Sequence, residues 1–166
     1  QDKIMLETYV QLDYFERMLL RANIRLMEMT EGRYELVRSK EAENKRSQSG
    51  LSLDVVDHYS GSERSVKSLS GGESFQASLA LALGLSDTVQ EEAGGIRLDA
   101  MFIDEGFGTL SEGALRAALN TLLELAAGQR LVGVISHVPE LKEKIERQIR
   151  IRKQADGGST AEIILP

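Results

Sequence analysis

Apolar residues recur at helical spacing along the first thirty positions of the chain. Met5, Leu12, Leu19 and Leu26 lie seven residues apart, and Thr8, Phe15, Ala22 and Met29 follow each of them by three positions. This stripe predicts one of two structures: the base of a long coiled coil whose partner strand is missing, or an ordinary amphipathic helix packed on its own domain. Gln1 falls inside the pattern, which favours the coiled coil and indicates a piece of a longer protein.

Further along, shorter apolar runs alternate with helical patterns. Strands are expected at 33–38, 51–56, 100–103 and 131–135, a terminal hairpin at 150–153 and 161–165, and polar loops at 39–50 and 59–67. The runs at 100–103 and 131–135 are continuous, which is typical of parallel strands buried on both faces.

Between these two strands, Ser111 can cap a helix that ends at Gly128. Its inner face is expected to consist of Leu115, Ala118, Leu119, Leu122, Leu123 and Ala126. Pro139 suits the first turn of a short helix running to about Arg147. The fold class is therefore α/β.

The stretch from Ser68 to Leu85 carries a second kind of pattern. Ser70 and Glu73 have the spacing of a capping box, in which each side chain bonds the other residue's amide. Gly71 and Gly72 leave the first amides of the helix uncovered, and free amides at the positive end of a helix dipole can seat an anion. The helix that follows is apolar on nearly every side, so we expect it to be buried. A capping box alone is also typical of a plain core helix.

Two carboxylates, Asp104 and Glu105, follow the apolar run at 100–103 directly. Ligands of open α/β sheets bind outside the carboxyl ends of the strands. Mg²⁺ prefers hard oxygen ligands, so Asp104 is a candidate for the metal. Glu105 points elsewhere and is a candidate to polarise a water molecule as a general base. His137 follows the next apolar strand, where a histidine is either structural or part of the same site.

Composition narrows the range of functions. The net charge of −6 argues against a uniformly basic nucleic-acid surface, so any DNA contact must be local or lie elsewhere. No apolar run is long enough to span a bilayer, and no signal peptide is recognisable. The absence of cysteine excludes a disulfide framework and thiolate metal sites, and it fits a cytoplasmic protein.

Four motifs resemble those of ATP-binding-cassette (ABC) ATPases, in the order found there. LSGGES (69–74) resembles the signature motif, AMFIDE (100–105) the Walker B motif, GTLSEG (108–113) the D-loop, and ISH (135–137) the H-loop. The resemblance implies that ATP and Mg²⁺ are the cofactors. It implies that Asp104 belongs to the metal–water shell, that Glu105 polarises the attacking water, and that His137 contacts the γ-phosphate. The ATP-binding residues of the signature, Ser70, Gly71, Gly72 and Glu73, would close over nucleotide held by an opposite subunit.

The chain contains no phosphate-wrapping G-x-x-x-x-G-K-[ST] loop, and a heptad helix precedes the signature. This order resembles the structural-maintenance-of-chromosomes (SMC) type, whose split head places a P-loop lobe and a signature lobe at the two ends of an antiparallel coiled coil. The runs SLSGGESFQASLALALGLSD and FIDEGFGTL are similar to the SbcC family within that group, and the resemblance covers about residues 10–166. Ser111 departs from it, because the D-loop of the family usually ends in Asp. Residues 1–30 would be the coiled-coil base, and residues 31–166 the signature lobe.

The resemblance implies a function that the chain performs only in part. Two heads, each completed by a P-loop lobe, would engage around ATP and, with an SbcD-type nuclease, process DNA ends or hairpins. The isolated fragment would bind ATP weakly and not hydrolyse it. One alternative is another SMC-type head, from a recombination-repair or chromosome-organising protein without a nuclease partner. Another is a non-catalytic coiled-coil scaffold. No membrane partner is expected.

Overall fold

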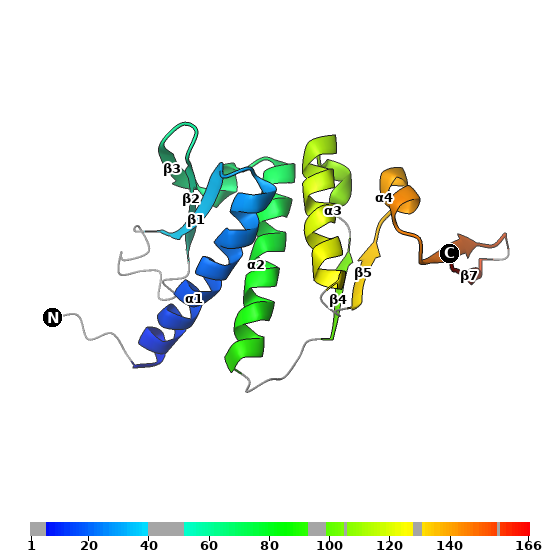
Figure 1. The fold of residues 1–166 in the computed structure, drawn as a ribbon, viewed down its shortest axis with the longest axis horizontal. Helices are drawn as coiled ribbons and strands as arrows, with labels where there is room; N and C mark the ends of the chain where they lie inside the picture. The colour runs from blue at the N-terminus through cyan, green and yellow to red at the C-terminus, as the bar shows by residue number, and fades with distance from the viewer. Residues whose placement is uncertain (1–5, 40–51, 93–98, 105, 128–130, 156) are drawn as a thin grey trace.

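Two long helices, α1 (Leu6–Met29) and α2 (Gly71–Glu92), cross at the centre of the N-terminal part of the computed structural model (Figure 1). The model describes residues 6–39, 52–92, 99–104, 106–127, 131–155 and 157–166. Where the helices cross, a Cβ added to Gly84 would lie 2.7 Å from both the Met18 carbonyl oxygen and the Ala22 amide nitrogen. Only a glycine allows the two backbones to approach so closely.

A three-stranded antiparallel sheet lies beside α1. It is formed, in spatial order, by β1 (Tyr34–Arg38), β2 (Leu53–Asp57) and β3 (Ser62–Ser65). The side chain of Asn23 on α1 pairs with the backbone of Leu36 in both directions, because its amide donates to the carbonyl at 2.8 Å and its oxygen accepts from the amide at 2.8 Å. Asn23 therefore satisfies backbone groups of Leu36 at the edge of the sheet and fixes α1 against β1.

The C-terminal part contains the two strands expected from the continuous apolar runs. These are β4 (Ala100–Asp104) and β5 (Leu131–Ile135), and they pair in parallel with Asp104 opposite Ile135. Helix α3 (Glu112–Ala127) connects them and α4 (Pro139–Lys144) follows β5. The chain ends in an antiparallel hairpin of β6 (Gln148–Lys153) and β7 (Ser159–Ile164), which lies at the opposite end of the molecule from α1 (Figure 1). The α/β class and the terminal hairpin are confirmed.

The buried core lies chiefly between α1, α2, β1 and α3. The second half of the heptad stripe contributes to it: Leu19, Ala22, Leu26 and Met29 are all buried. In this half the stripe does what an amphipathic helix does within its own domain. The assignment of residues 1–30 to a coiled-coil base stays a prediction, and residues 1–5 lie outside the described part.

The structure corrects several expectations about extent. The loop expected at 59–67 contains β3 and a 3-10 turn, η2 (Val66–Ser68), because an all-polar segment can pair at a sheet edge that faces water. Helix α2 continues past Leu85 as far as Glu92, and α4 ends at Lys144, short of Arg147. The loop expected at 39–50 lies outside the described residues except at Ser39.

Burial is also less complete than expected. Leu85 on α2 is 43% exposed, because the packing of α1 on one side of this helix leaves another side open. Strand β4 is not covered on both faces, since Phe102 is 69% exposed and the described sheet around it has only β5 as a second strand. On α3, Leu123 and Ala126 face solvent, and Thr121 and Leu125 are buried instead. Within the described residues, no helix is both long and apolar enough to cross a membrane.

Candidate functional site

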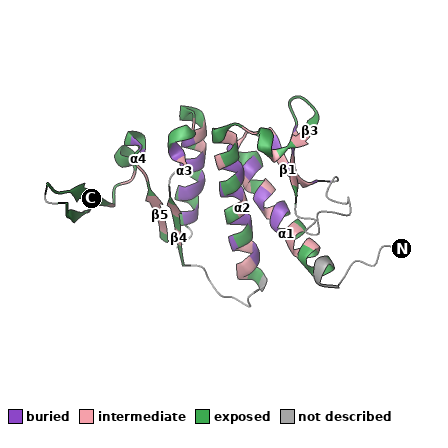
Figure 2. Cartoon of the chain, turned by 180° about the vertical axis from the view of Figure 1, so that it is seen from behind, coloured by how far each residue is buried: buried purple, intermediate pink, exposed green. Residues whose placement is uncertain are grey.

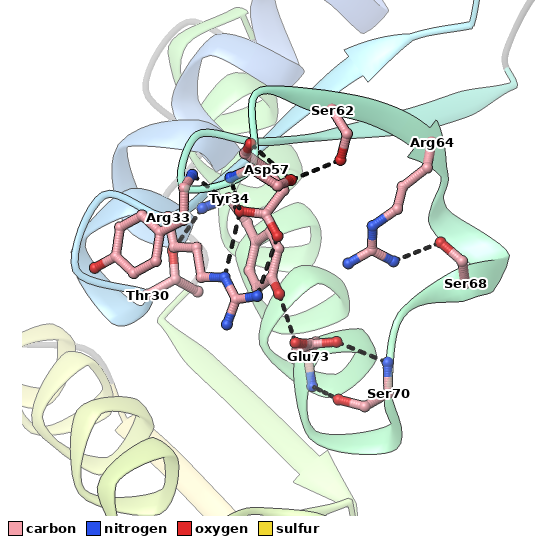
Figure 3. Close-up of polar contacts among 11 residues, drawn as sticks. Thr30, Arg33, Tyr34, Asp57, Ser62, Arg64, Ser68, Ser70 and Glu73 are labelled. Atoms are coloured by element: carbon pink, nitrogen blue, oxygen red, sulfur yellow. Dashed lines mark hydrogen bonds and ion pairs between the residues drawn. The ribbon is translucent and has the colours of Figure 1, made fainter.

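The first turn of α2 forms the capping box that the sequence predicts. The Ser70 amide donates to Glu73 Oε2 at 2.8 Å, and the Glu73 amide donates to Ser70 Oγ at 3.3 Å (Figure 3). Ser70 and Gly71 are exposed. The hydroxyl proton of Ser70 is not used by these bonds, and the first amides of a helix have no partner within it. This tip therefore presents donors to solvent at the positive end of the helix dipole.

Tyr34 on β1 completes the capping box from a distant part of the chain. Its hydroxyl donates to Glu73 Oε1 at 2.6 Å, and the residue is only 3% exposed (Figure 3). Burial and the bond to Glu73 raise the pKa of Tyr34 to about 12, so the phenol keeps its proton. Burial alone would raise the pKa of Glu73, but bonds from Tyr34 and Ser70 and the nearby Arg33 charge outweigh it and lower that pKa. Glu73 is thus an ionised acceptor.

Arg33 and Asp57 form an ion pair beside Tyr34. Arg33 Nη2 lies 3.1 Å from Asp57 Oδ2, and the guanidinium carbon lies 4.7 Å from the centre of the Tyr34 ring. The hydrogen bond from Arg33 lowers the pKa of Asp57 against the opposing effect of burial. The pair holds the ring of Tyr34 from one side, and this arrangement fixes where the phenol points.

A second group of predicted residues gathers at the carboxyl ends of β4 and β5. Asp104 ends β4 and is exposed, and the exposed His137 follows β5 by two residues. A Cβ built on Gly108 would lie 3.8 Å from His137 Nε2, so the loop after β4 lies against the histidine. Asp104 and His137 therefore share one edge of the sheet. Glu105 lies outside the described residues.

The loop after β4 also contacts the tip of α2. This loop contains Gly106, in the left-handed region at φ 90°, and a 3-10 turn, η3 (Phe107–Thr109). A Cβ at Gly72 would lie 3.3 Å from the Thr109 carbonyl oxygen, and one at Gly71 3.5 Å from Thr109 Cβ. The structure therefore brings the signature, D-loop and H-loop segments together around η3.

An aromatic pair holds this loop in place. Phe107 is buried, and its ring centre lies 4.8 Å from that of Phe75 on α2. The Phe75 ring also occupies the space beside Gly106, where an added Cβ would lie 2.2 Å from it. A residue other than glycine at position 106 would have to adopt a positive φ, and its side chain would clash with the Phe75 ring.

The donor chemistry fits the cofactors that the motifs imply. An exposed aspartate at the end of a strand supplies one hard oxygen, which suits Mg²⁺ that keeps several waters and phosphate oxygens. The exposed hydroxyl of Ser70 and the amides of Gly71 and Gly72 suit phosphate oxygens. Within the described ranges no three His, Asp or Glu residues form a cluster.

Sequence reasoning missed Tyr34, Phe75 and Phe107 as parts of the site. Tyr34 stands 39 positions before Glu73 in a short alternating strand, and nothing local distinguishes its hydroxyl. Phe75 and Phe107 look like ordinary core residues. A signal did exist at Gly106, because a glycine directly after two carboxylates indicates a tight approach or a positive φ.

The sequence of the chain is similar to one protein family and to individual members of it. Residues 40–124, slightly more than half of the chain, match the family described as SbcC/RAD50-like, Walker B motif. The chain is 56% identical over 145 residues to the SbcC subunit of the nuclease SbcCD from Staphylococcus saprophyticus, covering 87% of this chain but 14% of that protein.

Two solved structures share the fold. One, from a study of ATP-driven dimerization and DNA-stimulated activation of SMC ATPases, has a TM-score of 0.69 at 14% identity and covers 95% of this chain and 89% of its own. The other, an Smc head bound to the C-winged helix domain of ScpA, also has a TM-score of 0.69, at 15% identity, and covers 93% of this chain and 44% of its own. The chain has the fold of one lobe of a split, ABC-type SMC head.

Proposed function

Because this chain belongs to the SbcC/RAD50-like, Walker B motif family, we propose that it is the signature lobe of a two-lobed ATPase head that hydrolyses ATP only together with a P-loop lobe. The chain spans about 14% of the length of the staphylococcal SbcC protein that it matches, so the rest of the head would come from the remaining sequence. The lobe is of the SbcC type, an SMC-like ATPase.

One observation carries the proposal: the exposed donors of the α2 tip and the edge that holds Asp104 and His137 belong to one contiguous surface joined by η3. The chain has a candidate phosphate-binding site but no P-loop. Such a site is expected to contact a nucleotide that is bound mainly by another polypeptide segment. Ser70, Gly71 and Gly72 would bind the γ-phosphate of ATP held by a second head.

The nucleotide bound by the P-loop lobe of the same head would be contacted by Asp104, Glu105 and His137. Asp104 would hold the water shell of Mg²⁺, which supplies charge neutralisation for the phosphates when bound. Glu105 would take a proton from the attacking water, and His137 would donate a hydrogen bond to the γ-phosphate. General base catalysis of this kind contributes on the order of 10² to 10⁴ in rate.

In the cell, the complete ATPase head would act together with a nuclease. The relative at 56% identity is a component of the nuclease SbcCD. By analogy, ATP-dependent engagement of two copies would control an SbcD-type nuclease that processes DNA ends or hairpins in the cytoplasm. The second candidate is an SMC head that binds a ScpA-like protein, as one structural neighbour does at 15% identity. The higher identity favours the nuclease, and pull-down of the full-length protein distinguishes the two partners.

The seat for the opposite nucleotide is tested by Ser70→Arg in the full-length protein. The bulky side chain fills the tip, so ATP-dependent dimers should disappear from light scattering while single-head ATP binding is retained. Ala82→Arg, at an exposed position further along the same helix, is the matched control and should dimerise normally. Dimers that persist in Ser70→Arg would refute the proposed seat.

The proposed role of Glu105 as general base is tested by Glu105→Gln. Glutamine keeps the shape of the side chain but cannot accept the proton, so ATP binding should be retained, turnover should fall by about a hundredfold or more, and engaged dimers should accumulate. Undiminished turnover would remove Glu105 from the mechanism.

A further inference from the structure

The carboxylate of Glu73 lies one helical turn from a tip that is proposed to seat a phosphate. A negative charge there would compete with the phosphate for the free amides of Gly71 and Gly72. In the structure both of its oxygens are already engaged. Oε2 accepts from the Ser70 amide at 2.8 Å, and Oε1 accepts from the Tyr34 hydroxyl at 2.6 Å (Figure 3).

Tyr34 is held so that its hydroxyl points at Glu73. Its amide donates to Thr30 Oγ1 at 3.2 Å, and Thr30 Oγ1 donates to the Leu26 carbonyl at 2.7 Å, which anchors the start of β1 to the end of α1. The guanidinium carbons of Arg33 and Arg64 lie 4.7 and 5.9 Å from the centre of its ring. The buried phenol has few rotamers left.

The second oxygen of Glu73 therefore depends on a residue outside the motif. A capping box needs only one carboxylate oxygen, the one that accepts from the N-cap amide. Without the phenol, the other oxygen would lose a charge-assisted bond and the side chain could rotate toward the amides of Gly71 and Gly72. The helix would still be capped part of the time, but the phosphate seat would hold a negative charge.

We infer that Tyr34 is a positioning residue for the signature tip: by holding the Glu73 carboxylate back against β1, it keeps the Ser70 hydroxyl and the glycine amides open to a phosphate from the second head. The inference rests on the proposed function, because it assigns to β1 a part in ATP-dependent engagement. It adds a residue that belongs to none of the four motifs.

The test is Tyr34→Phe in the full-length protein, which removes the hydroxyl and keeps the ring. Dimerisation is measured by light scattering with Mg²⁺ and a non-hydrolysable ATP analogue, and single-head affinity with a fluorescent analogue at protein concentrations below the dimer Kd. The dimer Kd should rise about tenfold, the scale of one hydrogen bond to a charged group, with single-head affinity unchanged.

Tyr59→Phe is the matched control. Tyr59 also lies over Arg33, at 5.4 Å from its guanidinium carbon, but it is 70% exposed, and its hydroxyl bonds no described residue. This variant should dimerise like the parent. Melting temperature is followed for both variants, because a purely structural role predicts a lower value for Tyr34→Phe with an unchanged dimer Kd, and that result would overturn the inference.

A double-mutant cycle with Glu73→Gln tests whether Tyr34 acts through the carboxylate. If it does, the combined variant should weaken dimerisation less than the product of the two single effects, and two effects that multiply would overturn the inference. A parent protein that stays monomeric with the analogue would overturn the proposed function and this inference together. A parent that engages while Tyr34→Phe engages equally well overturns the inference alone.

Discussion

The described strands of the N-terminal and C-terminal parts of the chain bury their apolar side chains to very different degrees. In the N-terminal part, the buried strand residues Tyr34, Leu36 and Val55 belong to the same core as α1 and α2, and the crossing of these helices is close enough to exclude a single methyl group at Gly84. In residues 99–166 the strands carry large apolar side chains that face solvent. These are Phe102, Leu131, Ile135, Ile149, Ile151 and Ile163, all more than half exposed.

Figure 2 makes the difference visible: α1 and α2 are purple where they face one another, whereas the C-terminal hairpin is almost entirely green. Clusters of exposed large apolar side chains are typical of surfaces that another protein segment covers. The comparison teaches where a composite head would be joined. On the proposed function, the P-loop lobe would cover the exposed face of the C-terminal sheet, because the core of the N-terminal part lies within the chain itself.

The largest effect is expected at the helix crossing. Gly84→Leu forces a side chain into the Met18 and Ala22 backbone, which cannot move aside as a flexible side chain can, so unfolding should become easier by about 3 kcal/mol. Urea denaturation measures it. Gly113→Ala on α3 is the control, since nothing lies within 4 Å of its added Cβ, and it should stabilise by about 0.5 kcal/mol. A small cost for Gly84→Leu would contradict the close crossing.

The exposed sheet face gives the next effect. Phe102 packs over Gly133 but is 69% exposed, so Phe102→Ala should cost about 1 kcal/mol in the chain on its own. In a protein that also contains the P-loop lobe the ring should be buried, and the cost should rise to about 3 kcal/mol. The unfolding free energies of both forms provide the comparison. Equal costs would mean that this face stays uncovered.

Alkaline pH should weaken the link between β1 and α2. The folded state raises the pKa of Tyr34 from 10.0 to about 12, so the stabilisation is complete below pH 10 and is lost as the pH rises toward 12. Tyr34→Phe should therefore lose less stability than the parent between pH 9 and about 11.5, followed by urea midpoints. Parallel pH curves would show that the phenol is not held as the structure has it.

The smallest effects distinguish the two helix caps. Ser70 belongs to a reciprocal box that Tyr34 reinforces, whereas Ser111 accepts a bond from the Ala114 amide at 3.3 Å at the start of α3. Ser70→Ala should cost about 1 kcal/mol and Ser111→Ala about 0.5 kcal/mol, measured by thermal unfolding. The reverse order would show that the box contributes nothing beyond a simple cap.

Local features of the site were predictable from the sequence. The capping box between Ser70 and Glu73 and the cap at Ser111 follow from spacings of three residues, which a helix fixes by itself. The parallel pairing of β4 and β5 follows from two continuous apolar runs joined by a helix. Strand β3 was not predictable, because its four polar residues carry no alternation and their pairing with β2 is a contact between separate segments.

The sequence by itself determined most of the helices and strands, because hydrophobic period and capping act over a few residues. The order of the four motifs was also legible there, as a resemblance to ABC ATPases. Only the tertiary structure decided that Tyr34 reaches Glu73, that η3 lies between the α2 tip and His137, and that Phe102 stays exposed. Contacts between residues distant in the chain depend on how whole elements pack. An apolar pattern states that a face must be covered, and it does not state by what.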